Sequence, residues 1–222
     1  ELLNPYGSLK DRIALNMLDI EESKDKTVIE SSSGNTAKAL AALCSSHGIT
    51  FKTITNRIKQ PEIRKILQIL DAHVEELPGH SECPDPNDPE DSIKVIEREV
   101  SKSPEKYFFT NQYANPKNIA AHKSSGKEIL QDLKNVNYFF SYLGTCGSSV
   151  GIGGVLKDSC DTTCIGIVTQ EGEYVPGGRS ENELREAGFY DEQFYESIIK
   201  GTTSEAIRGM LELNRKYGIP CG

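Results

Sequence analysis

The chain has 222 residues, of which 36% are hydrophobic and 26% are charged, an ordinary composition for a globular protein with a buried core. Its formal net charge is −8 and no basic cluster stands out, so nucleic acid and anionic membranes are poor candidates as partners. Apolar runs such as 39–44 and 138–140 are too short to span a bilayer, and no signal peptide opens the chain. We therefore expect a cytoplasmic protein.

The first expected element is a helix that follows the turn residues Asn4–Gly7. Ser8 and Asp11 have the spacing of a capping box, which places Lys10 in the first turn of this helix. Hydrophobic periodicity and turn residues then predict strands at 27–31, 51–55, 73–77 and 107–110, and helices at 37–47, 62–70, 92–101 and 117–133. Segment 78–91, rich in Pro, Gly, Asp and Asn, is expected to be a loop.

The second half of the chain continues the alternation. An aromatic strand is expected at 137–142, buried on both faces, and it leads into the small-residue segment Gly144–Ser149. A glycine-containing helix, a strand at 163–168, a loop at 175–180 and a helix at 202–217 follow. This order predicts an α/β fold with a largely parallel sheet and with ligand loops at the carboxyl ends of the strands.

Lys10 is a candidate catalytic residue because of its place at a helix start. The unpaired N–H groups there carry partial positive charge, which favours the neutral, nucleophilic amine of a lysine. Such an amine can form a Schiff base with a carbonyl cofactor and later transfer a proton. The alternative is a solvated lysine on a surface helix.

Two loops between a strand and a helix have the composition of anion sites. Ser32–Thr36 is dense in short hydrogen-bond donors, and its alternative role is simple N-capping by Ser33 or Asn35. Gly144–Ser149 matches neither a dinucleotide fingerprint nor a P-loop, so it is either a phosphate cradle of another design or an ordinary glycine-rich turn.

Cysteine and histidine spacing predicts no metal site and no disulfide scaffold. Cys160 and Cys164 are the closest pair of cysteines, and no histidine lies near them. We interpret all six cysteines as reduced thiols, with Cys146 as structural filler rather than a redox group: Cys44, Cys83, Cys146, Cys160, Cys164 and Cys221. The four histidines are scattered: His47, His73, His80 and His122.

Four motifs in order resemble the cysteine synthase and cystathionine β-synthase family, pyridoxal-phosphate (PLP) enzymes of fold type II. They are Asn4-Pro5-x-Gly7-Ser8-x-Lys10-Asp11-Arg12, Ser33–Thr36, Asn111–Pro116 and Gly144–Ser148. The resemblance implies two lobes of mostly parallel sheet flanked by helices, residues 1–115 and 116–222, with the PLP cleft between them. It also implies further segments before Glu1 and after Gly222, so we expect a piece of a longer protein.

The resemblance assigns roles to single residues. Lys10 would carry PLP and act as the acid-base group at the substrate's α-carbon, and Asn35 would hydrogen-bond the ring hydroxyl of the cofactor. The phosphate would be held by Gly144, Thr145, Cys146, Gly147 and Ser148. The substrate carboxylate would be bound by Ser33, Gly34, Asn35, Thr36 and Gln112, with the glycine loop of Gly177 and Gly178 facing the substrate.

The resemblance also implies a reaction. Thr36 and the Thr145–Ser148 pattern are typical of the synthases rather than of the dehydratases, which favours β-replacement on an activated serine-type amino acid by a thiol, sulfide or amine. The product would be cysteine or a related β-substituted alanine, and the enzyme would be a homodimer. Ala37 and Cys146 depart from the glycines usual in the family. A catalytically silent fragment or paralogue, or a serine/threonine dehydratase-type lyase, is the alternative.

Overall fold

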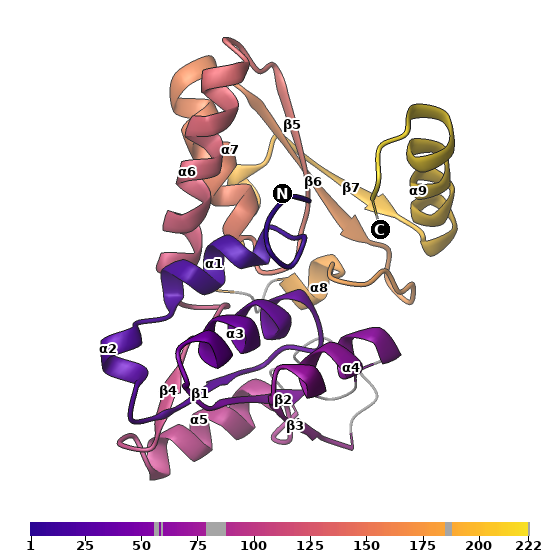
Figure 1. Ribbon diagram of the computed structural model, residues 1–222. Coiled ribbons are helices and arrows are strands. Elements are labelled where there is room, and N and C mark those ends of the chain that lie inside the picture. Colours follow the sequence, from indigo (N-terminus) through magenta and orange to yellow (C-terminus); the bar gives the residue numbers. More distant parts are fainter. Residues whose placement is uncertain (56–57, 59, 79–87, 185–187, 222) are drawn as a thin grey trace. The chain divides into compact units, whose positions relative to one another are not determined.

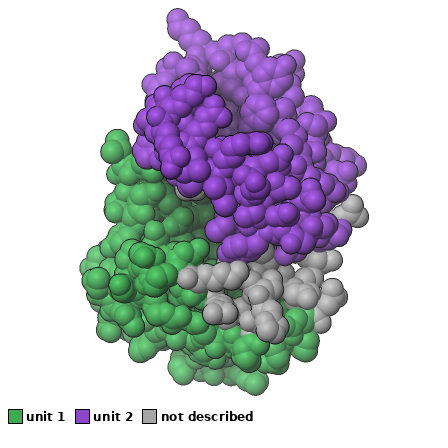
Figure 2. Space-filling model, turned by 90° about the vertical axis from the view of Figure 1, so that its right-hand side faces the viewer, with its two compact units in different colours: residues 1–124 green, residues 125–222 purple. Residues whose placement is uncertain are grey.

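The structure is a computed structural model that describes residues 1–55, 58, 60–78, 88–184 and 188–221 (Figure 1). The chain divides into two compact units, Glu1–Ser124 and Ser125–Gly222, coloured separately in Figure 2. This division lies inside helix α6 (Lys117–Asp132), whereas the resemblance placed the lobe boundary after Asn115. Most of the expected loop 78–91, with His80 and Cys83, lies outside the described residues.

The first unit is built on a four-stranded parallel sheet. Its spatial order is β3-β2-β1-β4, and every neighbouring pair is parallel. The strands are β1 (Thr27–Glu30), β2 (Phe51–Thr55), β3 (His73–Glu76) and β4 (Tyr107–Phe109), each within one residue of its predicted bounds. Parallel strands end at the same edge of the sheet, so the loops that follow β1 and β4 come together there.

Helices cover both faces of this sheet. Figure 1 shows α3 and α4 on one side of the strands and α5 on the other. The helices of the unit are α1 (Lys10–Met17), α2 (Ile20–Ser23), α3 (Asn35–Ser46), α4 (Pro61–Ile69) and α5 (Ser92–Lys102). Pro61 occupies the first position of α4, where its missing N–H costs no helical hydrogen bond.

The core of the first unit follows from strand alternation. Val28 belongs to a buried cluster with Leu40 of α3 and Leu67 of α4. Its neighbour Ile29 points to the opposite face and packs with Ile96 of α5. A strand that is apolar on both sides is typical of a parallel sheet covered by two layers of helices.

The second unit contains a three-stranded parallel sheet of order β5-β6-β7. Its strands are β5 (Tyr138–Tyr142), β6 (Thr163–Thr169) and β7 (Ser197–Gly201). Its other elements are α7 (Gly147–Cys160), α8 (Glu181–Leu184), the 3-10 helix η1 (Glu192–Phe194) and α9 (Thr203–Tyr217). Within the described residues, no helix is long and apolar enough to cross a membrane.

Three short elements of the second unit were not predicted: β7, α8 and η1. β7 has only two apolar residues, Ile198 and Ile199, and a charged residue follows them, so its sequence lacks a clear strand pattern. Its pairing with β6 makes it a strand. By contrast, α9 was predicted from its amphipathic spacing and from Gly218, which ends the helix with φ 64°. The structure adds a capping box of Thr202 and Glu205 at its start.

The prediction that β5 is buried on both faces is wrong. Tyr138 is 62% exposed and Phe140 is 55% exposed, whereas Phe139 between them packs into the buried cluster that contains Leu143 and Cys164. The aromatic residues of β5 therefore indicate a strand, because aromatic side chains favour strands, but they do not indicate that both of its faces are buried.

The first prediction concerns the close packing of α6 on α7. A Cβ atom at Gly126 would lie 2.8 Å from Cβ of Val155, which belongs to the neighbouring helix and is fixed to its backbone. Gly126→Ala should therefore lower the free energy of unfolding by about 1–3 kcal/mol despite the better helix propensity of alanine.

Urea denaturation followed by circular dichroism measures this change. Gly154→Ala in α7 is the matched control, because its Cβ would meet no atom within 4 Å. It should leave the unfolding free energy unchanged or raise it by up to about 1 kcal/mol. Equal stability of the two variants would contradict the packing argument.

Candidate active site

Lys10 lies in the first turn of α1, as predicted; it is the first residue of the helix and is half-buried. The capping box is wrong in detail, because the N-cap residue is Leu9 and it makes no side-chain hydrogen bond. Instead, Ser8 Oγ accepts from the N–H of Lys10 at 3.2 Å, and Asp11 Oδ2 accepts from the N–H of Tyr6 at 2.9 Å. These two bonds tie the preceding turn to the helix and fix where Lys10 begins it.

The helix that carries Lys10 packs on the helix that carries the first anion loop. Ala14, one turn after Lys10, and Ala37, next to Thr36, belong to the same buried cluster. The order of β1, a small polar loop and the start of α3 at Asn35 agrees with the sequence prediction. α3 thus begins at the carboxyl end of β1, where its unpaired N–H groups favour an anion.

Ser32 caps this loop, a role that the sequence had offered to Ser33 or Asn35. Its Oγ accepts from the N–H of Gly34 at 3.3 Å and from that of Ala37 at 3.1 Å. Within the described part of the chain, the side chains of Ser33 and Asn35 make no hydrogen bond. Their hydroxyl and amide groups are therefore available to a ligand.

Thr36 and Gln112, which are 76 residues apart in sequence, meet in this site. Thr36 Oγ1 donates to Gln112 Oε1 at 2.8 Å, and both side chains are buried. Gln112 Nε2 donates to the carbonyl oxygen of Ser31 at 2.9 Å. The amide of Gln112 therefore has one fixed orientation at the start of α3.

Glu30 is a residue of this site that sequence reasoning missed. It is the last residue of β1 and is completely buried. Burial raises the pKa of its carboxyl to about 7, although hydrogen bonds from Thr110, Ser31 and Gln112 act in the opposite direction. The signal in the sequence was one acidic residue directly after an apolar pair in a buried strand.

His122 was also missed as a residue of this region. It lies on α6, its side chain is fully buried, and neither ring nitrogen has a hydrogen-bond partner among the described residues. Burial, together with the positive charges of Lys10 and Arg12, lowers the pKa of His122 to about 4. The ring is therefore neutral at pH 7, within the electrostatic reach of Lys10.

The second anion loop, in the second unit, is the turn between β5 and α7. Cys146 is the N-cap of α7 and adopts a left-handed conformation with φ 63°, which explains why glycine suits this position. It makes no side-chain cap hydrogen bond. The first N–H groups of this helix, together with the hydroxyls of Thr145 and Ser148, have the chemistry that a phosphate group requires.

The buried hydroxyls of Ser149 and Tyr195 hold this turn in place. Ser149 Oγ donates to the carbonyl oxygen of Cys146 at 2.9 Å and lies 2.7 Å from the hydroxyl of Tyr195. Burial raises the pKa of the Tyr195 hydroxyl, so it stays protonated and can donate. Tyr195 was not recognised from the sequence because it lies 46 residues away from its partner.

The structure brings the glycine loop to the same turn. A Cβ atom at Gly144 would lie 2.6 Å from the carbonyl oxygen of Gly177, which itself has φ 83°. A Cβ atom at Gly178 would overlap the ring of Tyr142. Sterics therefore require glycine at Gly144 and Gly178, and the positive φ favours it at Gly177. Gly177 packs against Gly144 within the second unit, and Gly178 is buried.

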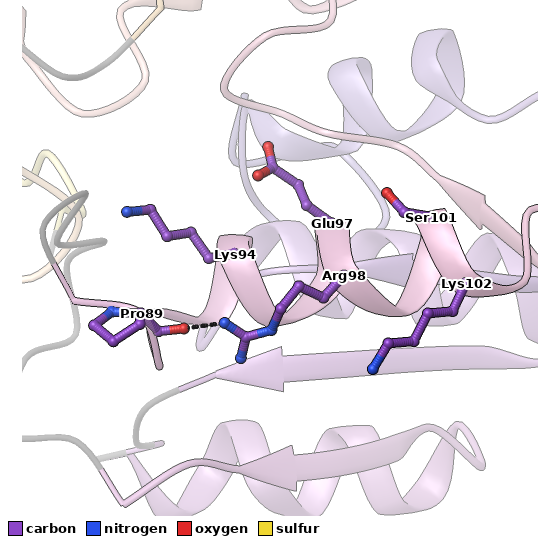
Figure 3. A pocket seen from close by; sticks show the side chains of 6 residues that line it. All are labelled: Pro89, Lys94, Glu97, Arg98, Ser101 and Lys102. Carbon is purple, nitrogen blue, oxygen red and sulfur yellow. Dashed lines mark hydrogen bonds between the residues drawn. The ribbon is translucent and has the colours of Figure 1, made fainter.

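The described residues of the first unit form two surface grooves, among others. One, of about 570 Å³, runs along α5, where the side chains of Lys94, Arg98 and Lys102 follow each other at four-residue spacing (Figure 3). Arg98 is engaged by Glu90 and by the carbonyl of Pro89. The other, of about 420 Å³, lies at the amino ends of the strands, and none of the predicted site residues lines either groove.

Among the described residues, no group of three or more His, Cys, Asp and Glu side chains could hold a metal ion. The described cysteines are free thiols: Cys44, Cys146, Cys160, Cys164 and Cys221.

Comparisons with known proteins agree with this arrangement. The model of the family "Pyridoxal-phosphate dependent enzyme" matches residues 1–222. A cysteine synthase of Staphylococcus aureus is 31% identical over 241 residues, which cover 100% of this chain and 74% of that protein. Among solved structures, a hydrogen sulfide-producing enzyme from Fusobacterium nucleatum is 28% identical with a TM-score of 0.83 over 100% of this chain and 76% of that one.

The fold prediction is confirmed by a third likeness. The structure of a cysteine synthase from Entamoeba histolytica superposes with a TM-score of 0.83 over 99% of this chain and 67% of that chain, at 24% identity. At this identity the likeness concerns the fold alone. It agrees with the parallel sheets flanked by helices in both units.

The second prediction uses the lowered pKa of His122. A base whose pKa falls on folding stabilises the native state above its unfolded pKa of 6.5, and this stability is lost as the pH falls towards about 4. When the pH is lowered from 7 to 5, the ionisation of His122 should reduce the free energy of unfolding of the wild type by about 2 kcal/mol. His122→Gln, which cannot ionise, should lose that much less over the same interval.

Urea titrations at the two pH values measure the difference between wild type and variant. His73→Gln is the control, because the ring of His73 is exposed and folding does not bury it. An identical pH dependence for His122→Gln and the wild type would show that His122 can charge freely in the native protein.

Proposed function

Because the chain belongs to the pyridoxal-phosphate dependent enzyme family, we propose that it catalyses PLP-dependent β-replacement on an activated serine-type amino acid, forming cysteine or a related β-substituted alanine. The family and the cofactor predicted from the four motifs are confirmed. The observation that carries the proposed reaction is the likeness to a cysteine synthase, which extends over all of this chain and 74% of that protein. The anion loop at the start of α3 provides the amino-acid site that such a reaction needs.

Lys10 has the central role in the proposal. Its amine would hold the cofactor covalently, then take the proton from the α-carbon of the substrate and later return it. The position supports this role, because the first turn of α1 is held by the bonds of Ser8 and Asp11. The nearby neutral His122 adds no second positive charge at pH 7.

The start of α3 would bind the substrate carboxylate. The N–H groups of Asn35 and Thr36, the hydroxyl of Ser33 and the free hydrogen of the Gln112 amide are donors of the right kind for a carboxylate. Gly34 has no side chain to cover the neighbouring N–H groups, and a Cβ there would lie 3.9 Å from Cδ1 of Ile63, an ordinary contact distance. Asn35, which is exposed, would also reach the ring hydroxyl of the cofactor.

The turn from Gly144 to Ser148 would bind the cofactor's phosphate. Backbone N–H groups at the start of α7 would do most of this, and the Cys146 thiol, which is buried, would face away from the anion. When bound, PLP supplies an electron sink that makes the α-proton acidic and lets a β-substituent leave. The Gly177 and Gly178 loop would face the substrate.

The nucleophile completes the reaction. A thiol, sulfide or amine would add to the β-carbon after the leaving group departs, and closure of the carboxylate loop would exclude water, which competes as a nucleophile. The cytoplasmic location and the homodimer stay predictions from composition and from the family.

The third prediction tests the assignment of Lys10. Lys10→Ala removes the amine that holds the cofactor, so the purified variant should lose the visible absorbance band of the covalently bound cofactor and the activity with it. An absorbance spectrum from 300 to 500 nm measures this directly.

Lys24→Ala is the matched control, because Lys24 is an exposed lysine paired with Glu21 on α2. It should keep both the band and the activity. Retention of the band in Lys10→Ala would refute the assignment.

The fourth prediction distinguishes β-replacement from its alternatives. With PLP, O-acetylserine and sulfide, the protein should form cysteine, which ninhydrin detects, with little pyruvate. Pyruvate in the absence of any added nucleophile would indicate a dehydratase-type lyase. An intact fold with no product of either kind would indicate a silent paralogue.

A further inference from the structure

Glu30 connects the two chain segments that form the proposed carboxylate site. Its Oε1 accepts from the N–H of Ser31 at 2.9 Å. Its Oε2 accepts from the N–H of Gln112 at 3.1 Å and from Thr110 Oγ1 at 2.6 Å. One buried carboxylate therefore bonds the loop that follows β1 and the loop that follows β4 at the same time.

These bonds determine where the amide of Gln112 lies. The main chain of Gln112 is held by Glu30, and its side chain is held by the carbonyl oxygen of Ser31. Ser31 is in turn held by Glu30 through its own N–H. The amide oxygen of Gln112 then accepts a hydrogen bond from the hydroxyl of Thr36. Glu30 is thus connected to the first turn of α3 by two hydrogen bonds, one to the main chain of Gln112 and one from Thr36 to its side chain.

We propose that Glu30 is a positioning residue for binding of the substrate's carboxylate. It touches neither substrate nor cofactor. It fixes the side chain of Gln112 so that one amide hydrogen points to the anion loop. This inference rests on the proposed function of that loop as the amino-acid site.

The chemistry of the carboxylate makes the role specific to a glutamate. Both oxygens act as acceptors for backbone N–H groups, one for Ser31 and one for Gln112. An amide at this position has a single acceptor oxygen, and its NH₂ group would face the other N–H in either orientation. Glu30→Gln therefore leaves one buried N–H without an acceptor, although its shape is unchanged.

The test is a steady-state comparison of Glu30→Gln with the wild type. The KM for O-acetylserine should rise about tenfold or more, as expected for a lost buried hydrogen bond in the binding site, while kcat at saturation changes less than about threefold. The absorbance band of the cofactor should stay the same. An unchanged KM would overturn the proposal.

Two matched variants separate positioning from general loss of stability. Thr110→Val removes the third donor to Glu30 but leaves both backbone N–H bonds, so its KM should stay within about twofold of wild type. Asp91→Asn alters another buried carboxylate, which caps α5 through the N–H of Ile93 at 2.8 Å. An equal rise of KM in Asp91→Asn would mean that any buried change has this effect, and would overturn the proposal.

Hydrogen exchange of the cofactor-free protein gives a readout that needs no activity. In Glu30→Gln, peptides covering 110–113 and 31–36 should exchange at least several-fold faster, while peptides from α9 should not change. If the peptides covering 110–113 and 31–36 exchange at the same rate in wild type and variant, the proposal is overturned. If the wild type binds no PLP, the proposed function fails, and this measurement still decides whether Glu30 positions Gln112.

Glu30→Asp covers the case in which Glu30→Gln does not fold. It keeps the charge and both acceptors but is one methylene shorter, so it cannot reach both N–H groups in place. It should also raise the KM with kcat preserved. A KM equal to that of wild type in a folded Glu30→Asp protein would refute a positioning role.

Discussion

The parallel pairing of β1 with both β2 and β4 is the constraint on which the first unit depends. Because the strands are parallel, the carboxyl ends of β1 and β4 lie at the same end of the sheet, and the loops that follow them are neighbours. Gln112 therefore meets the start of α3, although 76 residues separate it from Thr36. Glu30, at the last position of β1, is then placed where one carboxylate can accept from both segments.

The buried ionisable groups of this unit respond to pH in opposite directions. The pKa of Glu30 is raised, so the stability it contributes is largest below pH 4.5 and is lost as the pH rises through about 7. The pKa of His122 is lowered, so its contribution is present above pH 6.5 and is lost as the pH falls through about 4. Both groups are kept where desolvation disfavours their charge, which is typical of functional sites.

The two units use the same local device. In each, a strand of the parallel sheet ends in a turn of small residues, and a helix begins there: β1 with α3, and β5 with α7. The turn in the first unit is held by Ser32 and Gln112, and the turn in the second is held by the Ser149 and Tyr195 hydroxyls. Positively polarised helix starts thus provide both of the proposed anion sites.

By itself the sequence determined the order of most strands and helices, the place of Lys10 in the first turn of the first helix, and the bounds of β2, because periodicity, capping residues and glycines act over a few neighbours. It also indicated Ser33–Thr36 and Gly144–Ser148 as candidate anion loops. Only the tertiary structure decided that Phe140 is exposed, that 197–201 is a strand, and that Glu30 and His122 are buried. These properties depend on contacts between residues far apart in the chain, which no local pattern records.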